Sequence, residues 1–489
     1  MRILMVSSEV ETFARSGGLG DVVLSLSRAL AQLGHEVCVV TPLYGTTSLN
    51  RPHHYWYGTV PVRVGWGPGD VREVGVCEIS EIEGRLRFCL VANDYLFGTR
   101  DGIYGDASGT FGDNEVRFAT LSRGALEIAA RLWPDGFDVI HAHDWHAALA
   151  VIYARTVMGE RWAQMPSVFT IHNLAYQGTI GAEALDRLGI PRELMSWRAL
   201  LHEGKVNLLK GAIALADLVT TVSPTYAEEI QTAADGFGLD WFLRAHADKL
   251  VGLVNGIDQD RFDPATDSRI AARFGEHDFG QGKWENKRAL LEEMGLAESD
   301  APLFGCVTRL TDQKGIDLFI ETLSAIALRG ANVVIVGTGD RRLEESLRRA
   351  QMRIPESVAV RIAFDSALAQ RVYAGSDFIV VPSRFEPCGL TQLYAMRYGT
   401  VPVVTDVGGL HDTVEPANTA RSEGTGFIAV RPSVFDLLVA LEDAIDVYAD
   451  RLGFAELRLR CMRRNSSWEK SAHAYVQDIY ARITDRTSS

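Results

Sequence analysis

Short apolar runs alternate with amphipathic stretches through the first half of the chain. Apolar residues between positions 20 and 34 recur at helical spacing, and Gly34 follows them as a helix C-cap. Two further helical patterns lie at residues 118–132 and 145–157. The apolar runs between these patterns predict β-strands at residues 2–6, 36–40, 87–91, 139–141, 168–171 and 218–222. This alternation predicts a doubly wound parallel sheet.

A second alternating series begins near Leu250. Its apolar runs predict strands, each followed by a turn and a helix, at residues 304–307, 333–336, 358–362, 378–381 and 402–404. We therefore expect an α/β fold of two Rossmann-like, doubly wound domains that face each other across a cleft. The expected divisions are an N-terminal domain at 1–248, a C-terminal domain at 249–460, and a helical segment at 461–489 that packs back on the N-terminal domain.

The composition is that of a soluble globular protein, with 47% hydrophobic and 23% charged residues. The N-terminal apolar stretch is too short for a signal peptide, and no apolar run reaches the roughly 18 residues of a membrane span. Six scattered cysteines without a CxxC pair favour a reducing cytoplasm. A net charge of -14 without a basic tract speaks against nucleic acid as a partner, but not against a small anionic ligand held by local cations.

Glu386 stands between an apolar run at residues 378–381 and an amphipathic segment at 390–398. It therefore lies at the carboxyl edge of the second predicted sheet, where open α/β sheets bind ligands. The partial positive charge of a helix N-terminus favours the ionised carboxylate there, and so a role as acceptor or nucleophile rather than general acid. The alternative interpretation is a helix-capping glutamate beside a structural proline.

A glycine-rich loop at residues 15–21 follows the first predicted strand. Adjacent Gly17 and Gly18 allow a ligand to approach the backbone, and free N–H groups at the following helix start suit an anion. The loop is not a dinucleotide fingerprint, because eleven residues separate Val6 from Gly18. Arg15 beside the glycines favours phosphate or sugar binding over a flexible surface loop.

Arg309 and Lys314 follow the predicted strand at residues 304–307 and precede another helix. Arginine binds phosphate oxygens as a planar fork and lysine supplies a point charge, so the pair is suited to hold a diphosphate. Taken alone, the same residues also fit a solvated loop with ordinary surface charges.

The run from His141 to His146 contains three histidines and an aspartate. Alternate residues at a strand end point to opposite faces, so we do not expect all four to converge on a metal. His143 and Asp144 remain candidates for the cleft. His172 and Asn173 close the strand at 168–171 at the same edge, and the polar and aromatic groups that follow them suit a sugar.

These segments together closely resemble the bacterial glycogen synthase and plant starch synthase family, which are retaining glucosyltransferases of GT-B architecture. The resemblance spans nearly the whole chain in family order, and it is carried by residues 8–22, 141–146, 169–178, 220–226, 255–258, 309–315 and 382–392. It implies transfer of glucose from a nucleotide diphosphate glucose to the non-reducing 4-hydroxyl end of an α-1,4-glucan. It also places the sugar donor mainly on the C-terminal domain and the acceptor on the N-terminal domain.

The resemblance assigns roles to individual residues. Arg309 and Lys314 would hold the donor diphosphate, and Glu386 would contact the donor glucose and be needed for transfer. His172 would lie at the transferring sugar. The resemblance implies further residues that bind the sugar donor. They are the Gly17-Gly18 loop with Arg15, Phe364, which would pack on the nucleotide base, and the motif residues Cys388, Gly389, Leu390 and Thr391. The resemblance also implies a place for Asp144 among the catalytic residues. It implies that Asp21, Asn173 and His143 are further residues of the cleft.

The implied chemistry is a front-face transfer in which the leaving phosphate helps to deprotonate the acceptor, with no metal or other cofactor. Three departures from the family stand out: Thr12 where proline is usual, Arg15-Ser16 where Lys-Thr is usual, and Thr405-Asp406 where a basic stretch is usual. ADP-glucose is the expected donor. The alternatives are UDP-glucose as the donor, a related transferase that uses a different acceptor, and a protein that binds glucan without turnover. Cys388 is expected to serve packing, because its surroundings are apolar.

Overall fold

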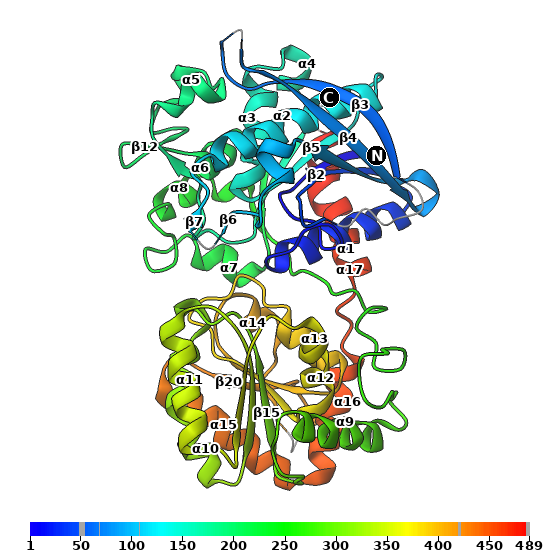
Figure 1. The fold of residues 1–489 in the computed structure, drawn as a ribbon, viewed down its shortest axis with the longest axis vertical. Helices are drawn as coiled ribbons and strands as arrows, with labels where there is room; N and C mark the ends of the chain where they lie inside the picture. The colour runs from blue at the N-terminus through cyan, green and yellow to red at the C-terminus, as the bar shows by residue number, and fades with distance from the viewer. Residues whose placement is uncertain (48–53, 68, 107, 419–421, 486–489) are drawn as a thin grey trace. The chain divides into compact units, whose positions relative to one another are not determined.

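The computed structural model describes residues 1–47, 54–67, 69–106, 108–418 and 422–485, which form two compact units (Figure 1). The first unit comprises Met1–Val222, Ala227–Gly256 and Trp468–Ser489, and the second comprises Ser223–Tyr226 and Ile257–Ser467. Each unit is built on its own largely parallel sheet, so the predicted α/β class with two Rossmann-like domains is confirmed. Within the described ranges, no helix is long and apolar enough to span a membrane.

Nine strands form the main sheet of the first unit, in the order β14-β13-β9-β8-β1-β2-β5-β4-β3. The strands from β14 to β5 run parallel, and chain connections leave the central β1 on both sides. The strand order therefore reverses between β1 and β8, where doubly wound sheets bind ligands. The strands are β1 (Arg2–Val6), β2 (Glu36–Pro42), β3 (His54–Arg63), β4 (Val71–Glu81), β5 (Leu86–Ala92), β8 (Val139–His143), β9 (Ser167–Ile171), β13 (Leu218–Thr221) and β14 (Leu250–Gly252).

Three helices of the first unit lie close to the helical patterns predicted near residues 20–34, 118–132 and 145–157. In the first of them, Gly34 lies beyond the last turn with φ of +91°, and its amide donates to the Ala31 carbonyl over 3.1 Å, so the predicted glycine C-cap is confirmed. The helices are α1 (Gly18–Gln32), α2 (Asn114–Leu132), α3 (Asp144–Thr156), α4 (Glu160–Ala163), α5 (Ala184–Leu188), α6 (Leu208–Leu215), α8 (Asp240–Ala245), α17 (Trp468–Ala474) and α18 (Ala481–Thr484). Helix α7 (Pro224–Glu229) spans a point where the chain passes between the units.

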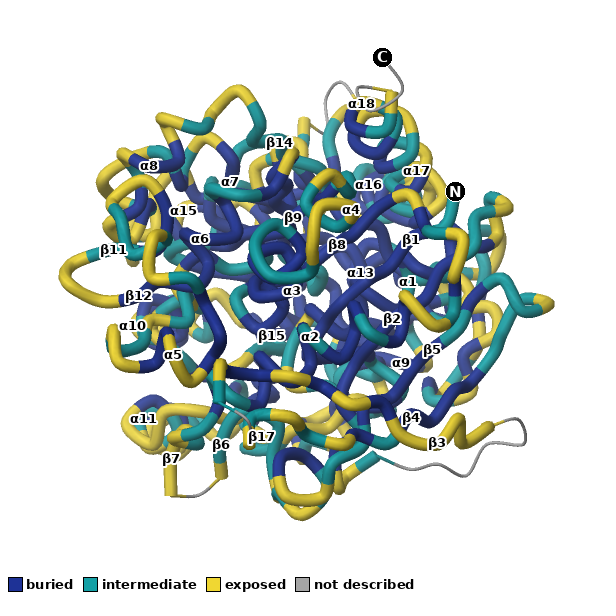
Figure 2. The backbone as a smooth tube through the Cα atoms, turned by 90° about the horizontal axis from the view of Figure 1, so that it is seen from above, coloured by how far each residue is buried: buried dark blue, intermediate teal, exposed yellow. Residues whose placement is uncertain are grey.

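The hairpin of β3 and β4 was not predicted from the apolar pattern. Most side chains of β3 are exposed, since it is the edge strand and pairs only with β4. Two small sheets also consist of strands that are too short to show a period-2 pattern in the sequence. One pairs β6 (Gly105–Asp106) with β7 (Gly109–Thr110), and the other contains β10 (Thr179–Ile180), β11 (Leu201–His202) and β12 (Lys205–Asn207). Figure 2 shows the contrast between the exposed outer segments and the buried parallel strands.

The second unit contains a six-stranded, fully parallel sheet in the order β17-β16-β15-β18-β19-β20. Here the strand order reverses between β15 and β18. The strands are β15 (Leu303–Val307), β16 (Asn332–Gly337), β17 (Val358–Ile362), β18 (Phe378–Val381), β19 (Val401–Thr405) and β20 (Phe427–Ala429). The helices are α9 (Phe279–Glu293), α10 (Ile316–Leu328), α11 (Arg341–Arg353), α12 (Ser366–Gly375), α13 (Thr391–Arg397), α14 (Gly408–Thr413), α15 (Val434–Ala449) and α16 (Arg451–Arg463).

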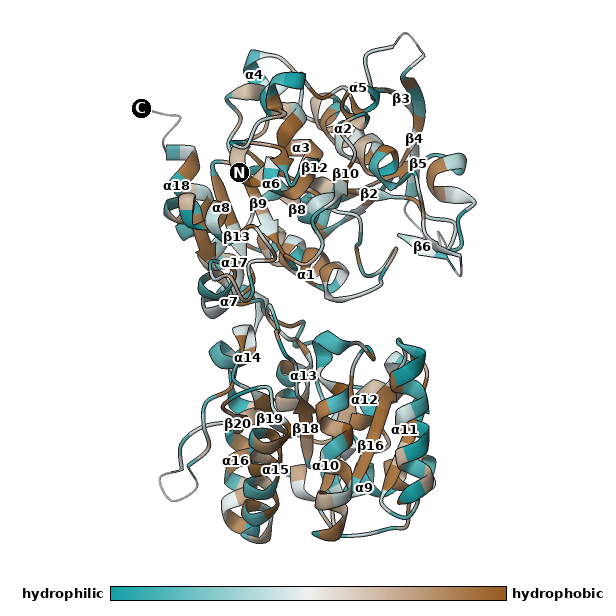
Figure 3. Cartoon of the chain, turned by 90° about the vertical axis from the view of Figure 1, so that its left-hand side faces the viewer, coloured by the Kyte–Doolittle hydropathy of each residue, from teal (hydrophilic) through white to brown (hydrophobic). Residues whose placement is uncertain are grey.

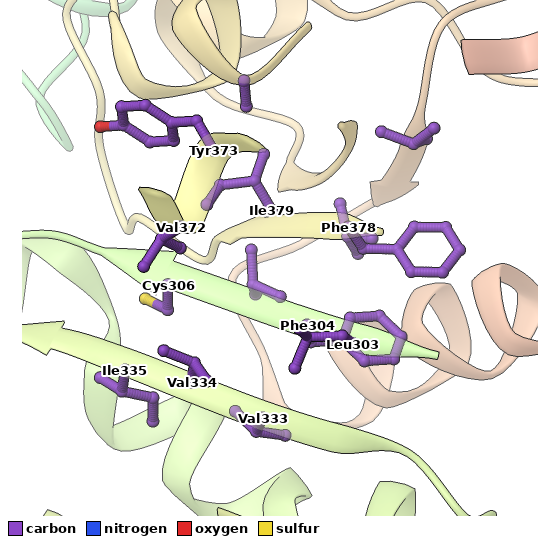
Figure 4. Packing of buried hydrophobic residues seen from close by; sticks show 14 of the residues in the cluster. Leu303, Phe304, Cys306, Val333, Val334, Ile335, Val372, Tyr373, Phe378 and Ile379 are labelled. Carbon is purple, nitrogen blue, oxygen red and sulfur yellow. The ribbon is translucent and has the colours of Figure 1, made fainter. Parts of the chain in front are cut away.

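Apolar strand residues on both faces of this sheet build the core of the second unit. Figure 4 shows Phe304, Ile335 and Ile379 among them. The rings of Phe304 and Phe378 are stacked, with 4.8 Å between their centroids. The hydropathy colouring in Figure 3 separates these hydrophobic strands from the hydrophilic outer side of α11. Burial on both faces explains why the strands read as continuous apolar runs in the sequence.

A buried charge cluster stands at the start of β18. Asp377 accepts hydrogen bonds from Lys287 Nζ at 2.7 Å and from the Arg458 guanidinium. Lys283 Nζ donates to the carbonyls of Tyr373 and Ser376 nearby. Because the two cations adjoin the Asp377 carboxylate, its pKa is lowered in spite of burial. The cluster fixes the amino end of β18, opposite the edge from which Glu386 projects.

Candidate active site

The second unit carries a small pocket at the carboxyl ends of β15 and β18, where the strand order reverses. Its lining brings together five of the predicted site residues: Lys314, Glu386, Gly389, Leu390 and Thr391. The remaining lining residues are Val307, Thr308, Val380, Val381, Pro382 and Ser383.

Lys314 and Glu386 form an ion pair in this pocket. Lys314 Nζ donates to Glu386 Oε2 over 2.5 Å, and Ser383 Oγ donates to the same oxygen over 2.8 Å. Glu386 itself is buried. The sequence predicts a helix N-terminus as the positive partner of this carboxylate, whereas the structure supplies an ammonium and a hydroxyl. The charge of each residue is thereby balanced by the other.

The loop that carries Lys314 is fastened to the glutamate turn by contacts that the sequence does not reveal. Gly315 has φ of +61°, and a Cβ there would lie 1.9 Å from the Pro382 carbonyl oxygen, so only glycine allows this approach. The Arg384 guanidinium donates to both carboxylate oxygens of Asp317, over 2.7 and 2.6 Å. These contacts join the Lys314 loop to the turn that carries Glu386.

The turn after Glu386 is also tightly packed. Gly409 N donates to the Glu386 carbonyl over 2.9 Å, and a Cβ on Gly409 would lie 2.2 Å from the Cys388 carbonyl oxygen. Gln392 Nε2 donates to the carbonyls of Gly389, over 2.7 Å, and Cys388, over 3.2 Å. Cys388 is buried in this turn, beneath the pocket rather than in its lining.

Arg309 and Phe364 lie outside the pocket lining. Arg309 is exposed directly after Thr308, and among the described residues it makes no ion pair. Phe364 is 72% exposed between β17 and α12. Asp406 stands where the family usually has a basic stretch, and its Oδ1 lies 2.7 Å from His411 Nδ1, within hydrogen-bond distance.

In the first unit, Glu9 holds the glycine-rich loop. Its buried carboxylate accepts hydrogen bonds from Ser16 N and Ser16 Oγ, both over 2.6 Å, and from Gly17 N over 3.3 Å. The Tyr104 hydroxyl donates to the same carboxylate over 2.5 Å. The apolar pattern predicts no role for Glu9, which lies within the segment 8–22 that carries the family resemblance. The Glu9 carboxylate therefore holds the loop through three hydrogen bonds from Ser16 and Gly17.

The loop leaves open space at Gly17. This residue has an extended φ of -157°, and a Cβ there would meet nothing within 4 Å. Neither strain nor packing thus requires glycine. Arg15 lies within reach of two carboxylates of its own segment, with Nη2 3.0 Å from Asp21 Oδ2 and Nη1 3.7 Å from Glu11 Oε1. The guanidinium is therefore held against the start of α1.

His143, Asp144 and His172 form a second cluster of the first unit, after β8 and β9. His143 Nδ1 lies 3.0 Å from His172 Nε2, and the His172 amide donates to Asp144 Oδ1 over 2.8 Å. Burial lowers the pKa of His172 to about 3, so the ring is neutral at physiological pH. Burial likewise raises the pKa of Asp144 to about 7, against the opposing effect of the His172 and Asn173 amides.

The other members of the histidine run make hydrogen bonds or ring contacts elsewhere, although the His141 ring also packs on His143 with 4.1 Å between ring centroids. His141 bonds to the Tyr480 hydroxyl at 2.8 Å and to Thr170 Oγ1 at 2.6 Å, and His146 stacks on the Tyr104 ring. No group of three or more His, Cys, Asp or Glu side chains is placed to hold a metal in the part of the chain that the structure describes. Asn173 Oδ1 accepts from the Ala175 amide over 3.0 Å and so shapes the turn that follows His172.

Comparison with known families covers both units. Residues 2–245 match the model described as the starch synthase catalytic domain, and residues 301–445 match the model described as glycosyl transferases group 1. A glycogen synthase of Myxococcus xanthus is 43% identical over 97% of this chain and 98% of its own length. A glycogen synthase of Anaeromyxobacter sp. strain Fw109-5 is 42% identical, again over 97% of this chain and 98% of its own.

Comparison with solved structures gives the same family. The catalytic domain of starch synthase IV from Arabidopsis thaliana, bound to ADP and acarbose, has a TM-score of 0.90 at 32% identity over 99% of each chain. Sucrose-phosphate synthase from Thermosynechococcus elongatus has a TM-score of 0.59 at 20% identity over 99% of each chain, and it shows a shared fold alone.

Proposed function

Because the chain belongs to the family of glycogen synthases and starch synthases, which are glycosyltransferases, we propose that it moves glucose from ADP-glucose to the non-reducing 4-hydroxyl end of an α-1,4-glucan, with retention at the anomeric carbon. The observation that carries the proposal is the Lys314–Glu386 ion pair in the pocket of the second unit. It holds together the cation that a leaving diphosphate needs and the carboxylate that a positively charged sugar needs.

Binding of the sugar donor would exchange the partners of this ion pair. The diphosphate takes the Lys314 ammonium, with Arg309 as a second cation, and Glu386 is then free to face the anomeric carbon. As the bond from that carbon to the phosphate oxygen breaks, Lys314 and Arg309 stabilise the negative charge on the phosphate. The Glu386 carboxylate stabilises the positive charge on the sugar.

Retention follows if the acceptor attacks from the side that the phosphate leaves. The leaving phosphate oxygen takes the proton of the acceptor 4-hydroxyl, and the new bond from the acceptor oxygen to the anomeric carbon forms on the same face. This route uses no protein nucleophile and no metal. His172 would act as a neutral hydrogen-bonding group at the sugar, since its pKa of about 3 keeps it uncharged. Asp144 orients the His172 main chain.

ADP-glucose is the proposed donor, and the ADP in the Arabidopsis neighbour supports this choice. UDP-glucose is the second candidate, because Arg15 and Asp406 depart from the family pattern. Six free cysteines, all buried, fit a protein that acts in a reducing cytoplasm.

Incubation of the purified chain with glycogen and each nucleotide glucose tests the proposal. We expect release of ADP, elongation of glycogen by segments that α-amylase cleaves, and a much lower rate with UDP-glucose. The Glu386→Gln variant is the negative control. Absence of nucleotide release with both donors would contradict the transferase assignment, and faster release of UDP would overturn the choice of donor.

A further inference from the structure

Three histidine rings form a column at the carboxyl ends of β8 and β9. His143 pairs with Thr170 in the parallel ladder, and side chains of paired residues, or of residues two positions apart on one strand, share a face of the sheet. His141, His143 and His172 therefore lie on the same face. Their ring centroids are 4.1 Å apart for His141 and His143, and 5.2 Å apart for His143 and His172. The proposed mechanism uses only His172 of these three.

Contacts from two other segments fix the His141 end of this column. His141 Nδ1 lies 2.8 Å from the Tyr480 hydroxyl and His141 Nε2 lies 2.6 Å from Thr170 Oγ1, so both ring nitrogens have partners. Tyr475 and Tyr480 both pack against the His141 ring, with 5.6 and 5.8 Å between centroids. The two tyrosines bound a π-helical turn, whose hydrogen bonds join residues five apart. His141 is thereby held in place beside the His143 ring.

All three rings of the column are neutral at physiological pH. Burial lowers the pKa of His141 and of His172 to about 3. Burial, together with the two neighbouring rings, also lowers the pKa of His143 well below its ordinary value. A neutral imidazole carries a single N–H, on either Nδ1 or Nε2. The position of that hydrogen decides which ring nitrogen can donate a hydrogen bond and which can accept one.

The hydrogen bond between His143 and His172 has a defined direction. His143 Nδ1 and His172 Nε2 are 3.0 Å apart, so one of these nitrogens carries the hydrogen and the other accepts it. The second nitrogen of His143, Nε2, is buried and has no hydrogen-bond partner among the residues that the structure describes. In folded proteins a buried N–H without a partner is rarer than a buried acceptor without one. The hydrogen of His143 therefore lies on Nδ1, and His172 Nε2 accepts it.

We propose that His143 is a positioning residue that sets the tautomer of His172 and thereby makes His172 Nδ1 a hydrogen-bond donor to the substrate. Because His172 Nε2 accepts from His143, the single ring hydrogen of His172 lies on Nδ1. His172 is partly exposed, and its Nδ1 bonds to no side chain or main chain within the described ranges, which leaves this donor for a sugar hydroxyl. Asp144 accepts from the His172 amide, so consecutive residues hold its ring and its main chain. The inference rests on the proposed function for the identity of the substrate.

Nitrogen NMR of the full chain, labelled with ¹⁵N-histidine, tests the tautomer without turnover. The protonated and the unprotonated nitrogen of a neutral imidazole have well-separated chemical shifts, and His172→Asn identifies the His172 signals by their loss. We expect a protonated Nδ1 and an unprotonated Nε2 for His172 in the wild type. In His143→Leu the hydrogen should move to Nε2 in a large share of the molecules, because a free imidazole side chain in water favours that tautomer. A hydrogen on Nε2 in the wild type, or the same tautomer in both proteins, would overturn the proposal.

Two variants of equal shape separate the hydrogen bond from the packing. Asparagine carries an amide N–H at the place of the histidine Nδ1, and leucine has the same branched shape without a polar atom. We expect His143→Asn to keep kcat within about threefold of the wild type and His143→Leu to lose about tenfold, the upper part of the range for one hydrogen bond. Both variants lose the ring contact with His141, so a merely structural role predicts equal losses. Equal kcat values in the two variants would overturn the positioning role.

The matched control is His473→Asn, at an exposed site on α17, which should leave kcat and the His172 signals unchanged. Thermal melts report whether the His143 variants fold, and if His143→Leu does not, the tautomer of the wild type decides alone. Failure of the proposed function gives a different pattern. A chain that releases no nucleotide from either sugar donor, yet carries the hydrogen on His172 Nδ1, would keep the tautomer and lose the transferase assignment. A chain that transfers glucose with the hydrogen on His172 Nε2 would keep the transferase assignment and overturn this inference.

Discussion

Lys314 Nζ lies 2.5 Å from Glu386 Oε2, although 72 residues separate the two in the chain. The ammonium and the carboxylate balance each other's charge in this pocket. Under the proposed function, a diphosphate would bind the Lys314 ammonium only by releasing it from Glu386. The proposed exchange would couple binding of the leaving group to exposure of the carboxylate.

We expect Glu386→Gln to keep the fold and most of the affinity for the sugar donor but to lose about 10²-fold or more in kcat. The amide keeps the shape of the carboxylate and removes the charge that faces the anomeric carbon. Steady-state kinetics with ADP-glucose and glycogen measure the loss, and thermal melts measure the fold. Glu321→Gln, an exposed glutamate on α10, is the matched control. Wild-type turnover in Glu386→Gln with an unchanged melt would contradict the role of Glu386.

The sequence predicts this half of the site well, because strand-to-helix turns place Lys314 and Glu386 at the same edge of a parallel sheet. It does not predict their ion pair. That contact depends on the left-handed conformation of Gly315 and on the Arg384–Asp317 bridge, which join segments far apart in the chain. Local patterns indicate where a strand ends but not which side chains meet across the edge.

The first unit is predicted less completely. Strand and helix periods place the glycine-rich loop and His172 at the carboxyl edge of the sheet, but Glu9 beneath the loop has no periodic signature. The contact between the rings of Trp197 and Trp241 was not predicted either, because both residues lie in segments without a clear period. The β3–β4 hairpin was not predicted because an exposed edge strand has no apolar run.

The Glu9 contacts predict an effect at Ser16. Ser16→Ala removes the hydroxyl that donates to Glu9, and we expect the KM for the sugar donor to rise by about tenfold, which corresponds to the lower end of the free energy of a hydrogen bond to a charged group. Ser16→Thr keeps the hydroxyl and should behave as the wild type. Ser346→Ala, on the exposed face of α11, is the control. An identical KM in the Ala and Thr variants would show that Ser16 does not hold the loop.

Arg15 is expected to influence the sugar donor, but the structure indicates a route through Asp21. Arg15→Lys keeps a cation beside Asp21 and should stay active, while Arg15→Ala should lose more than about tenfold in donor affinity or rate, which is about 1.4 kcal/mol. The double variant Arg15→Ala/Asp21→Asn separates two causes. Recovery in the double variant would show that Arg15 mainly balances the Asp21 charge. If the double variant is as impaired as Arg15→Ala, Arg15 contacts the donor phosphates directly. Wild-type kinetics of Arg15→Ala would contradict both the contact with the phosphates and the charge balance with Asp21.

Asp144 makes stability depend on pH. Burial raises its pKa to about 7 in the folded protein, whereas the unfolded chain has the ordinary value near 3.8. The folded state therefore binds the proton more tightly. The stability that this group contributes is fully present below about pH 4 and is lost as the pH rises through about 7. Asp144→Asn keeps an oxygen that can accept from the His172 amide but no longer titrates.

We therefore expect the melting temperature of Asp144→Asn, relative to the wild type, to rise between pH 5 and pH 8. The gain should be about 1 kcal/mol or more, or about 2–4 °C for a domain of this size. The neighbouring histidines, whose pKa values burial lowers, titrate in both proteins and so largely cancel in the difference. Asp101→Asn, at an exposed site, is the matched control for the loss of one carboxylate. A constant difference for Asp144→Asn would mean that Asp144 titrates with its ordinary pKa, and its burial beside His172 would then carry no energetic consequence.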